Sequence, residues 1–146
     1  MIEFEHCLRA PDDADEWCAF HVIRRKVLFE NRGKADYVNN HPDDFKPGNH
    51  PLILLFRQEV IGVVRIDICE PEAWLRRVAI REELQRRGHG RVLLRLAELF
   101  ALDNGCSEIR TNAAIEAVGF YERCGYVPDP AKLSPPNSVT MRKPLR

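Results

Sequence analysis

Residues 78–91 have the sequence VAIREELQRRGHGR, and this stretch decides the fold. It starts with the end of an apolar strand, Val78-Ala79-Ile80, and continues through a polar turn into a helix predicted from near Gly88 to Asn104. Gly88 and Gly90 allow the backbone to approach a ligand closely and to adopt positive φ angles. The start of a helix presents unpaired N–H groups and about half a positive charge, so this turn is a candidate anion site.

The turn also carries formal positive charge where the helix begins, on Arg86, Arg87 and Arg91. Arginines and glycines together predict a cradle for a pyrophosphate. The turn is not a Walker A loop, because no Gly-Lys-Ser/Thr follows it. It is not a dinucleotide fingerprint either, because the third glycine is missing and a hairpin precedes it. The simpler alternative to a phosphate site is that the two glycines only allow the chain to turn.

A second motif, AVGFYERCGY, occupies residues 117–126. Taken together, the two motifs are similar to those of a known family. Gln-x-x-Gly-x-Gly opening a helix after Val-Ala-Ile resembles the acetyl-CoA loop of the GNAT N-acetyltransferases. The later Ala-x-x-Phe-Tyr-Glu-Arg-x-Gly-Tyr resembles that family's helix with a catalytic tyrosine. The resemblance is strong from Leu75 to Val127 and topological before that, and an early Arg24-x-x-Val27-x-Phe29-Glu30 is similar to the ElaA-type branch.

The resemblance implies that acetyl-CoA binds as a cosubstrate and that no metal is needed. Backbone groups of Val78 and Ile80 would hydrogen-bond the pantetheine arm as if it were an added strand. Amides of the turn would hold the pyrophosphate, and an N–H of the strand would polarise the thioester carbonyl. The residues implied in cofactor binding are Val78, Ala79, Ile80, Gln85, Arg86, Arg87, Gly88, His89, Gly90, Arg91 and Asn112.

The resemblance further implies that Tyr121 is the general acid that protonates the departing CoA thiolate. Reference pKa values near 10 for a phenol and about 8.5 for a thiol leave this proton transfer uphill by roughly 2 kcal/mol. The plain alternative is a tyrosine that only packs its ring at a helix end. Cys124 raises the question of a covalent acyl-cysteine route, but a thiol needs a nearby base or a strong positive field for that chemistry.

The chain departs from the family pattern in two places. The family usually has Asn three residues before the motif alanine, whereas this chain has Ala114, with Asn112 two positions earlier. A carboxylate often serves as the base on the strand before Val-Ala-Ile, but residues 74–77 are WLRR, and Glu72 lies out of register. The base therefore stays unassigned. Three loop acids are weaker candidates for attracting a cationic amine: Asp36, Asp43 and Asp44.

The remaining residues predict one mixed α/β domain over residues 1–146. Asp13 is expected to cap a helix with an apolar stripe, and a long loop at 30–50 has room for one short helix. The central helix is expected to face the core with Val92, Leu96 and Leu99, in a stripe that Leu93 and Phe100 widen. Strands are expected at 52–56, 60–66, 74–80, 108–111, 126–127 and 139–142, with a helix at 114–124. The expected fold is a mostly antiparallel central sheet flanked by helices.

Composition excludes several classes of function. The 146 residues include 22 Lys plus Arg and 22 Asp plus Glu, so the formal net charge is zero and gives no global attraction to nucleic acid or anionic membrane. No apolar run approaches the roughly 20 residues that a membrane-spanning helix needs, and residues 1–6 lack a secretion-signal pattern. Five cysteines without a C-x-x-C pair predict reduced thiols in a cytoplasmic protein.

The leading hypothesis from sequence is an N-acetyltransferase that moves an acetyl group from acetyl-CoA to a primary amine, on a small molecule or peptide, within a ternary complex. A non-catalytic acyl-CoA-binding or sensor module is the runner-up, favoured by the missing carboxylate. A nucleic-acid-binding domain built on the arginines comes third, and the neutral total charge argues against it. Residues 30–50 and 128–137 are expected to line the acceptor side, and a homodimer is left open.

Overall fold

The computed structural model of the protein describes residues 5–39, 41–131 and 134–146. The start of the chain, residues 1–4, for which the sequence predicts no secretion signal, lies outside this range. The elements in chain order are β1 (His6–Arg9), α1 (Ala14–Leu28), η2 (Glu30–Arg32), η3 (Pro42–Phe45), β2 (Asn49–Phe56), β3 (Glu59–Cys69), β4 (Glu72–Ile80), η4 (Glu82–Leu84), α2 (His89–Asp103), β5 (Glu108–Ala114), η5 (Ile115–Ala117), α3 (Val118–Arg123), β6 (Val127–Pro128) and β7 (Ser138–Pro144).

The strands form one sheet in the order β1-β2-β3-β4-β5-β7-β6. Every neighbouring pair is antiparallel except β4 and β5, which are parallel. The β2–β3 hairpin closes through Arg57 and Gln58, which both have positive φ (51° and 70°), as a two-residue turn compatible with the sheet twist requires. The expected mixed, mostly antiparallel sheet is confirmed.

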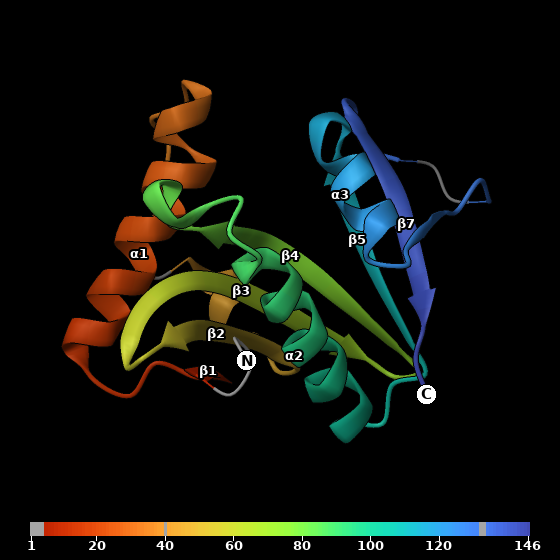
Figure 1. Ribbon diagram of the computed structural model, residues 1–146, viewed down its shortest axis with the longest axis horizontal. Helices are drawn as coiled ribbons and strands as arrows, with labels where there is room; N and C mark the ends of the chain where they lie inside the picture. The colour runs from red at the N-terminus through yellow and green to blue at the C-terminus, as the bar shows by residue number, and fades with distance from the viewer. Residues whose placement is uncertain (1–4, 40, 132–133) are drawn as a thin grey trace.

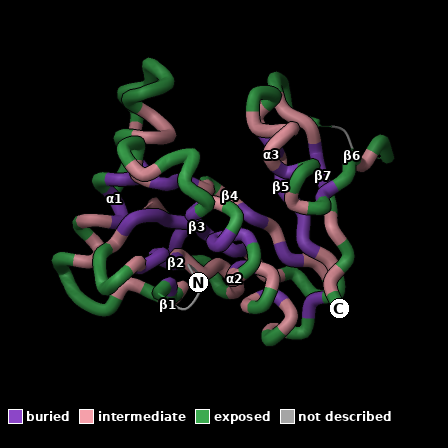
Figure 2. The backbone as a smooth tube through the Cα atoms, in the orientation of Figure 1, coloured by how far each residue is buried: buried purple, intermediate pink, exposed green. Residues whose placement is uncertain are grey.

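The two longer helices cover opposite faces of the sheet (Figure 1). Side chains alternate along a strand, so Leu52 and Leu54 of β2 join the core cluster of α2, whereas Ile53 joins that of α1. On the α1 side the cluster includes Phe20 and is the smaller of the two. Figure 2 shows the buried residues concentrated along the central strands between these helices. The α1 face and the α2 face of the sheet are therefore separate surfaces.

The parallel pair β4–β5 is short, and the two strands then diverge (Figure 1). Pairing runs only from Glu72 opposite Glu108 to Leu75 opposite Thr111. Just beyond it, the β3–β4 register shifts by one residue, and Arg77 takes a positive φ of 56°. A bulge of this kind bends the strand that carries it. Residues 76–80 of β4 consequently form one wall of an open wedge between β4 and β5.

Two expectations about helices differ from the structure. Leu99 was expected to face the core but is 53% exposed, whereas Leu93, Ala97 and Ala101 of the same helix are fully buried. The buried stripe of α2 runs through Leu93, Ala97 and Ala101, and at about 100° per residue Leu99 lies on the opposite side of the helix. The helix expected from Ala114 starts later, because Ala114 still pairs with Ser138 of β7 as the last residue of β5.

The predicted helix cap and long loop are both present. Asp13 caps α1 by accepting a hydrogen bond from the N–H of Glu16. The segment 30–50 contains η2 and η3, and a buried ion pair fixes it to α1. Arg24 donates two hydrogen bonds to Asp44, at 2.7 and 2.9 Å, and each residue is only 2% exposed. Arg65 adds a third contact to Asp44 at 3.4 Å. This pair holds the loop over the α1 face of the sheet.

The Asp44→Asn variant tests the role of this pair. The substitution leaves the Arg24 guanidinium buried without its main counter-charge, so the free energy of unfolding should fall by about 3–5 kcal/mol, as measured by urea denaturation at pH 7. The double variant Arg24→Met/Asp44→Leu buries no lone charge and should recover most of that loss. Wild-type stability of the Asp44→Asn protein would contradict this role.

The stabilisation should also depend on pH. Burial alone would raise the pKa of Asp44, but hydrogen bonds and charges from Arg24 and Arg65 outweigh it and hold the pKa below the ordinary value. A depressed carboxyl pKa stabilises the fold above the ordinary aspartate pKa. The contribution is lost as pH falls through the folded-state value. The difference in unfolding free energy between wild type and Asp44→Asn should therefore shrink in acid.

Candidate active site

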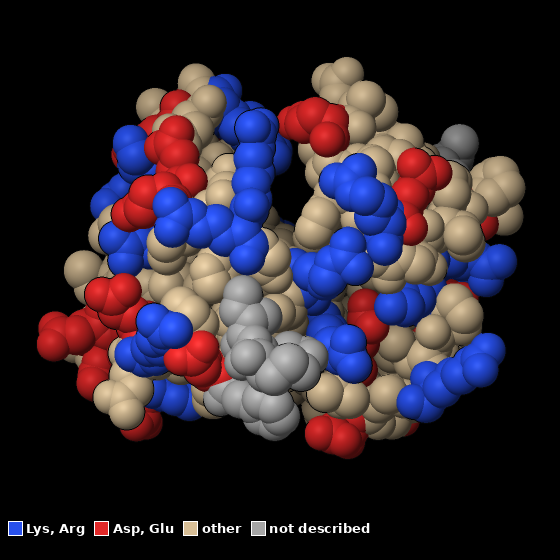
Figure 3. Space-filling model, in the orientation of Figure 1, with Lys and Arg blue, Asp and Glu red and all other residues tan. Residues whose placement is uncertain are grey.

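A cleft of about 1190 Å³ occupies the wedge between β4 and β5. Its walls come from the segment after α1, from β3 and β4, and from β5, η5 and α3. Figure 3 shows the surface hollowed between the lobe around η2 and the lobe of η5 and α3, with Lys and Arg side chains along the border. Leu75 and Thr111, the last pair of the β4–β5 ladder, lie at the point where the cleft begins.

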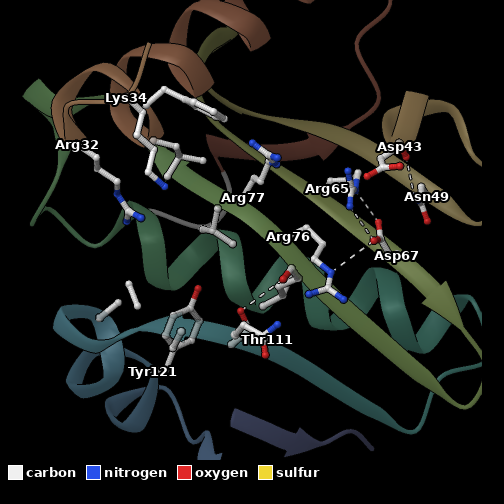
Figure 4. Close-up of a pocket in the computed structure, with 18 of the residues that line it drawn as sticks. Arg32, Lys34, Asp43, Asn49, Arg65, Asp67, Arg76, Arg77, Thr111 and Tyr121 are labelled. Atoms are coloured by element: carbon white, nitrogen blue, oxygen red, sulfur yellow. Dashed lines mark hydrogen bonds and ion pairs between the residues drawn. The ribbon is translucent and has the colours of Figure 1, made fainter. Parts of the chain in front are cut away.

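Tyr121 lines this cleft from α3, and Figure 4 shows its hydroxyl pointing into the space between the strands. The side chain is 6% exposed and packs edge-on against Phe120 and Tyr126, each with ring centroids 5.4 Å away. Burial raises the pKa of the Tyr121 phenol, and a hydrogen bond with Thr111 opposes part of that rise. The phenol is therefore protonated at neutral pH, as a proton donor must be, although the same rise makes it a weaker acid toward a thiolate than an ordinary phenol.

The start of α2 has the features of an anion site. Gly88 is the N-cap with φ of 90°, no side chain caps the helix, and its first turn has no acidic residue. The hydrogen bond from the Val92 N–H to the Gly88 carbonyl begins the helical ladder, so the preceding amides have no partner within the helix. Arg86 and Arg87 are exposed beside it. These groups fit a diphosphate, which accepts hydrogen bonds from backbone N–H groups and attracts positive charge.

A direct contact joins the two motifs. A Cβ added at Gly90 would lie 3.2 Å from the Cζ of Phe120, the residue before Tyr121. The glycine at position 90 is thus explained by the Phe120 ring, which reaches from α3 to the start of α2. This contact places the uncapped amides of α2 next to the helix that carries the phenol.

The backbone of β4 has one free edge beside the wedge. The Arg81 N–H bonds to the Ile61 carbonyl of β3, so the N–H and carbonyl of the preceding Ile80 point to the opposite side, toward β5. The Ile80 carbonyl accepts a hydrogen bond from Nε2 of Gln85 at 3.0 Å, which braces the turn. Ala79 pairs with Val63 and is buried under α1. Val78 lines the cleft.

Three side chains that the sequence places in the cofactor site instead make contacts within the protein. The Gln85 amide is bound to β4, as described. His89 is 4% exposed, lies 2.9 Å from Nε2 of His6 through its Nδ1, and packs on Phe56, so only its backbone N–H faces a ligand site at the helix start. Asn112 lines the cleft, and its Oδ1 accepts a hydrogen bond from the Thr140 hydroxyl at 2.8 Å.

The carboxylates considered for catalysis are engaged elsewhere. Glu72 lies in the paired segment of β4 and forms an ion pair with Arg110 at 3.2 Å, outside the cleft lining. Asp44 is buried against Arg24. Asp43 pairs with Lys46 at 2.8 Å, and Asp36 lines the cleft in an exposed position. The described part of the 128–137 segment contributes no lining residue, whereas the 30–50 segment contributes several.

Sequence reasoning missed a polar network on the cleft wall. Arg65 donates two hydrogen bonds to the Asp67 carboxylate, at 2.7 and 3.0 Å, and Arg76 lies 3.5 Å from the same carboxylate. Arg65 and Arg76 are cross-strand partners, so two like charges face each other and the aspartate neutralises them. The alternation of polar residues 65 and 67 within an apolar strand was the available signal. Thr111 was also missed, because nothing in sequence indicates its position beside Tyr121.

The cleft and the helix start open on different faces of the sheet. Arg65 and Asp67 lie on the α1 face, next to Asp44 and the 30–50 segment. The amides of Gly88 to Arg91 lie on the α2 face and are absent from the cleft lining. Tyr121 lies between them. The split between β4 and β5 therefore places the Tyr121 side chain between a cleft on one face and an uncapped helix start on the other.

A model of the GNAT acetyltransferase family matches residues 15–126, so the chain belongs to that family. A protein of Bacillus subtilis (strain 168), provisionally named an acetyltransferase, is 29% identical in an alignment over 107 residues that covers 71% of each chain. Escherichia coli ElaA shares the fold, with 16% identity, TM-score 0.78 and coverage of 95% of this chain and 98% of its own. The PaiA N-acetyltransferase of Thermoplasma acidophilum, solved with coenzyme A, shares it with 16% identity, TM-score 0.73 and the same coverage.

The described residues form neither a candidate metal site nor a membrane-spanning helix. Within residues 5–39, 41–131 and 134–146, no three His, Cys, Asp or Glu side chains are grouped so that they could hold a metal ion. None of the helices described there combines the length and apolar character needed to cross a membrane.

The raised pKa of Tyr121 can be tested by titration in the near ultraviolet. The chain has three tyrosines, and burial raises the pKa of Tyr37, Tyr121 and Tyr126 alike. We therefore expect less than half of the phenol signal to be ionised at the ordinary tyrosine pKa of about 10. The difference between wild type and Tyr121→Phe isolates Tyr121. Thr111→Val should shift that difference to still higher pH, and a Tyr121 signal at or below the ordinary value would contradict the burial argument.

Proposed function

We propose that this protein transfers an acetyl group from acetyl-CoA directly to a primary amine within a ternary complex. The observation that carries the proposal is the contact between Gly90 and Phe120, which joins an uncapped helix start to the helix that carries a protonated phenol. Family membership supports acetyl transfer, and a structural neighbour bound to coenzyme A supports the cosubstrate.

The amides and arginines at the start of α2 would hold the diphosphate of acetyl-CoA. The free edge of β4 at Val78 and Ile80 would accept the pantetheine arm through backbone hydrogen bonds, with the Ile80 N–H as the donor that the fold leaves unused. The thioester would then lie in the wedge next to Tyr121. The amine would enter from the cleft on the α1 face.

In the transfer step, the amine nitrogen attacks the thioester carbon and forms the new C–N bond while the C–S bond breaks. Tyr121 donates its proton to the departing thiolate, so that CoA leaves as a thiol. The amine loses its proton to solvent in the cleft, because Asp67 and Asp43 are bound to arginine and lysine and the third lining acid, Asp36, is an exposed loop residue. The phenolate recovers a proton afterwards, which balances the reaction.

Cys124 is excluded from this scheme as an acyl carrier. Burial raises the pKa of its thiol, which lowers the fraction of nucleophilic thiolate. Its side chain lies in a separate pocket with Lys143, away from the cleft that holds Tyr121.

The Tyr121→Phe variant tests the acid. Loss of a positioned general acid should lower kcat by about 10²–10⁴-fold, with little change in KM for acetyl-CoA. Because the pKa is raised, wild-type kcat should not fall on the alkaline side until pH passes well beyond the ordinary phenol range. The matched control is Tyr126→Phe, which removes a neighbouring hydroxyl bound to Glu98. Equal kcat in wild type and Tyr121→Phe would refute the assignment.

The Arg86→Gln/Arg87→Gln double variant tests the cosubstrate site. Both arginines are exposed, so we expect a modest loss of CoA affinity, about 5- to 10-fold at low salt and less as salt screens the charges. Calorimetric titration with CoA measures it, and Arg142→Gln, an exposed arginine on β7 away from the turn, is the control. Unchanged CoA affinity at low salt would contradict the proposal that this turn binds the diphosphate.

A non-catalytic acyl-CoA-binding module is the second candidate. It is favoured by the two hydrogen bonds that tie Asp67 to Arg65, because Asp36, an exposed loop residue, is then the one lining carboxylate among the described residues that no ion pair holds. Tight CoA binding without thiol release across a broad set of amines would favour the module over the transferase.

A further inference from the structure

The cleft wall carries an excess of positive charge. Its lining residues include six cationic and three anionic side chains. The cations are Arg32, Lys34, Lys46, Arg65, Arg76 and Arg77, and the anions are Asp36, Asp43 and Asp67. An excess of this kind at the acceptor entrance affects which amines can bind, because unreacted amines are themselves cationic in water.

Most of the negative charge in the cleft is already paired. Asp67 receives two hydrogen bonds from Arg65 and the nearby charge of Arg76. Asp43 is held by Lys46 at 2.8 Å. These carboxylates are therefore poor partners for an incoming ammonium group, and only the exposed Asp36 remains among the lining acids.

Three cations of the cleft remain after this pairing. Among the described residues, no carboxylate lies within ion-pair distance of Arg32, Lys34 or Arg77. Figure 4 shows Arg32 and Lys34 extending into the cleft from one side, Tyr121 rising from the other, and Arg77 between Lys34 and Arg65. These three cations form a half-ring on the side of the cleft that faces the phenol.

Arg77 is the most constrained of the three. The β4 bulge sets its backbone, with φ of 56°, and its guanidinium lies over the Phe29 ring at 5.1 Å. Its covered portion, together with the charges of Arg24 and Arg65, lowers the pKa of the guanidinium, which indicates a shortage of negative charge around it. An exposed arginine that lies over an aromatic ring and has no carboxylate partner among the described residues is suited to bind a carboxylate through two parallel hydrogen bonds.

The phosphates of a CoA molecule do not account for this charge. The proposed diphosphate site lies on the α2 face, whereas Arg32, Lys34 and Arg77 line a cleft that contains none of residues 85–91. All three side chains are exposed in the cleft, so they are accessible to an anionic group on the molecule that enters on the α1 face, which in the proposed function is the acceptor.

We propose that the acceptor is an amine that carries a carboxylate, either an amino acid or a peptide with an acidic group, and that Arg77 binds this carboxylate with help from Arg32 and Lys34. The inference rests on the proposed function and narrows its substrate class. Polyamines are disfavoured, because their additional ammonium groups would meet the same three cations.

Matched amines provide the test in the acetyl-CoA thiol-release assay. L-Alanine is compared with L-alaninamide, and L-alanyl-L-glutamate with L-alanyl-L-glutamine, with spermidine as a polyamine. We expect the carboxylate member of at least one pair to be preferred about 10- to 100-fold in kcat/KM, the range of one or two hydrogen bonds to a charged group. The first pair reports on a free amino acid and the second on an acidic peptide. Equal or better turnover of the amides or of spermidine overturns the proposal while the transferase activity stands.

The Arg77→Gln variant links any preference to this cleft. It should raise KM for the preferred carboxylate amine about tenfold or more while KM for acetyl-CoA stays unchanged. Arg32→Gln/Lys34→Gln should have a smaller effect in the same direction, and Arg142→Gln, with its exposed side chain on β7, should have none. Loss of CoA affinity in Arg77→Gln without any change toward the acceptor would overturn the proposal.

A binding measurement keeps the inference independent of turnover. N-acetyl-L-alanine and N-acetyl-L-alanyl-L-glutamate, together with the corresponding amides, are titrated calorimetrically into the full-length protein. Stronger binding of a carboxylate compound, lost in Arg77→Gln, supports the anion site even if no amine is acetylated and the transferase proposal fails. Equal binding of the acids and the amides overturns it.

Discussion

The short seam between β4 and β5 is the constraint on which the rest of the structure depends. A parallel pair that continued past Leu75 and Thr111 would fill the sheet and leave no cleft. The bulge at Arg77 bends β4 at this point, and β5 instead continues along β7. The wedge exposes a backbone edge, admits the Tyr121 hydroxyl and connects the two faces of the sheet. The proposed function uses all three features: the backbone edge for the pantetheine arm, the Tyr121 hydroxyl as the acid, and the connection between the faces for the entry of the amine.

Local signals in the sequence predicted much of this fold. Asp13 and Gly88 marked the starts of the two longer helices, because capping depends on residues adjacent in the chain. The arrangement of the cleft was not predictable in the same way. Nothing in sequence indicates that Arg77 takes a positive φ or that Arg76 lies opposite Arg65 and beside Asp67, since both depend on cross-strand register. Leu99 was assigned to the core because two apolar stripes of this helix have the same spacing. The sequence does not show that the stripe with Ala97 and Ala101 is the buried one.

The separation of charge between the two faces explains why composition alone was uninformative. Equal numbers of acidic and basic residues give a formal net charge of zero. On the α2 face, exposed arginines surround an uncapped helix start, and on the α1 face, ion pairs consume most of the acids. A balanced total therefore coexists with two locally positive sites of different geometry. One presents backbone N–H groups suited to phosphate, and the other presents guanidinium and ammonium groups suited to carboxylate.

Arg110 lies at the closed end of the wedge, where β4 and β5 still pair. Its guanidinium contacts Glu72 on β4 at 3.2 Å, and Glu108 and Asp129 on the other arm at 2.6 and 2.7 Å. The strands β4 and β5 pair only along four residue pairs, and Arg110 lies beside them. None of the four charged residues in this cluster lines the cleft. An ion-pair cluster outside the cleft therefore ties β4 to β5 at the closed end of the space that Tyr121 lines.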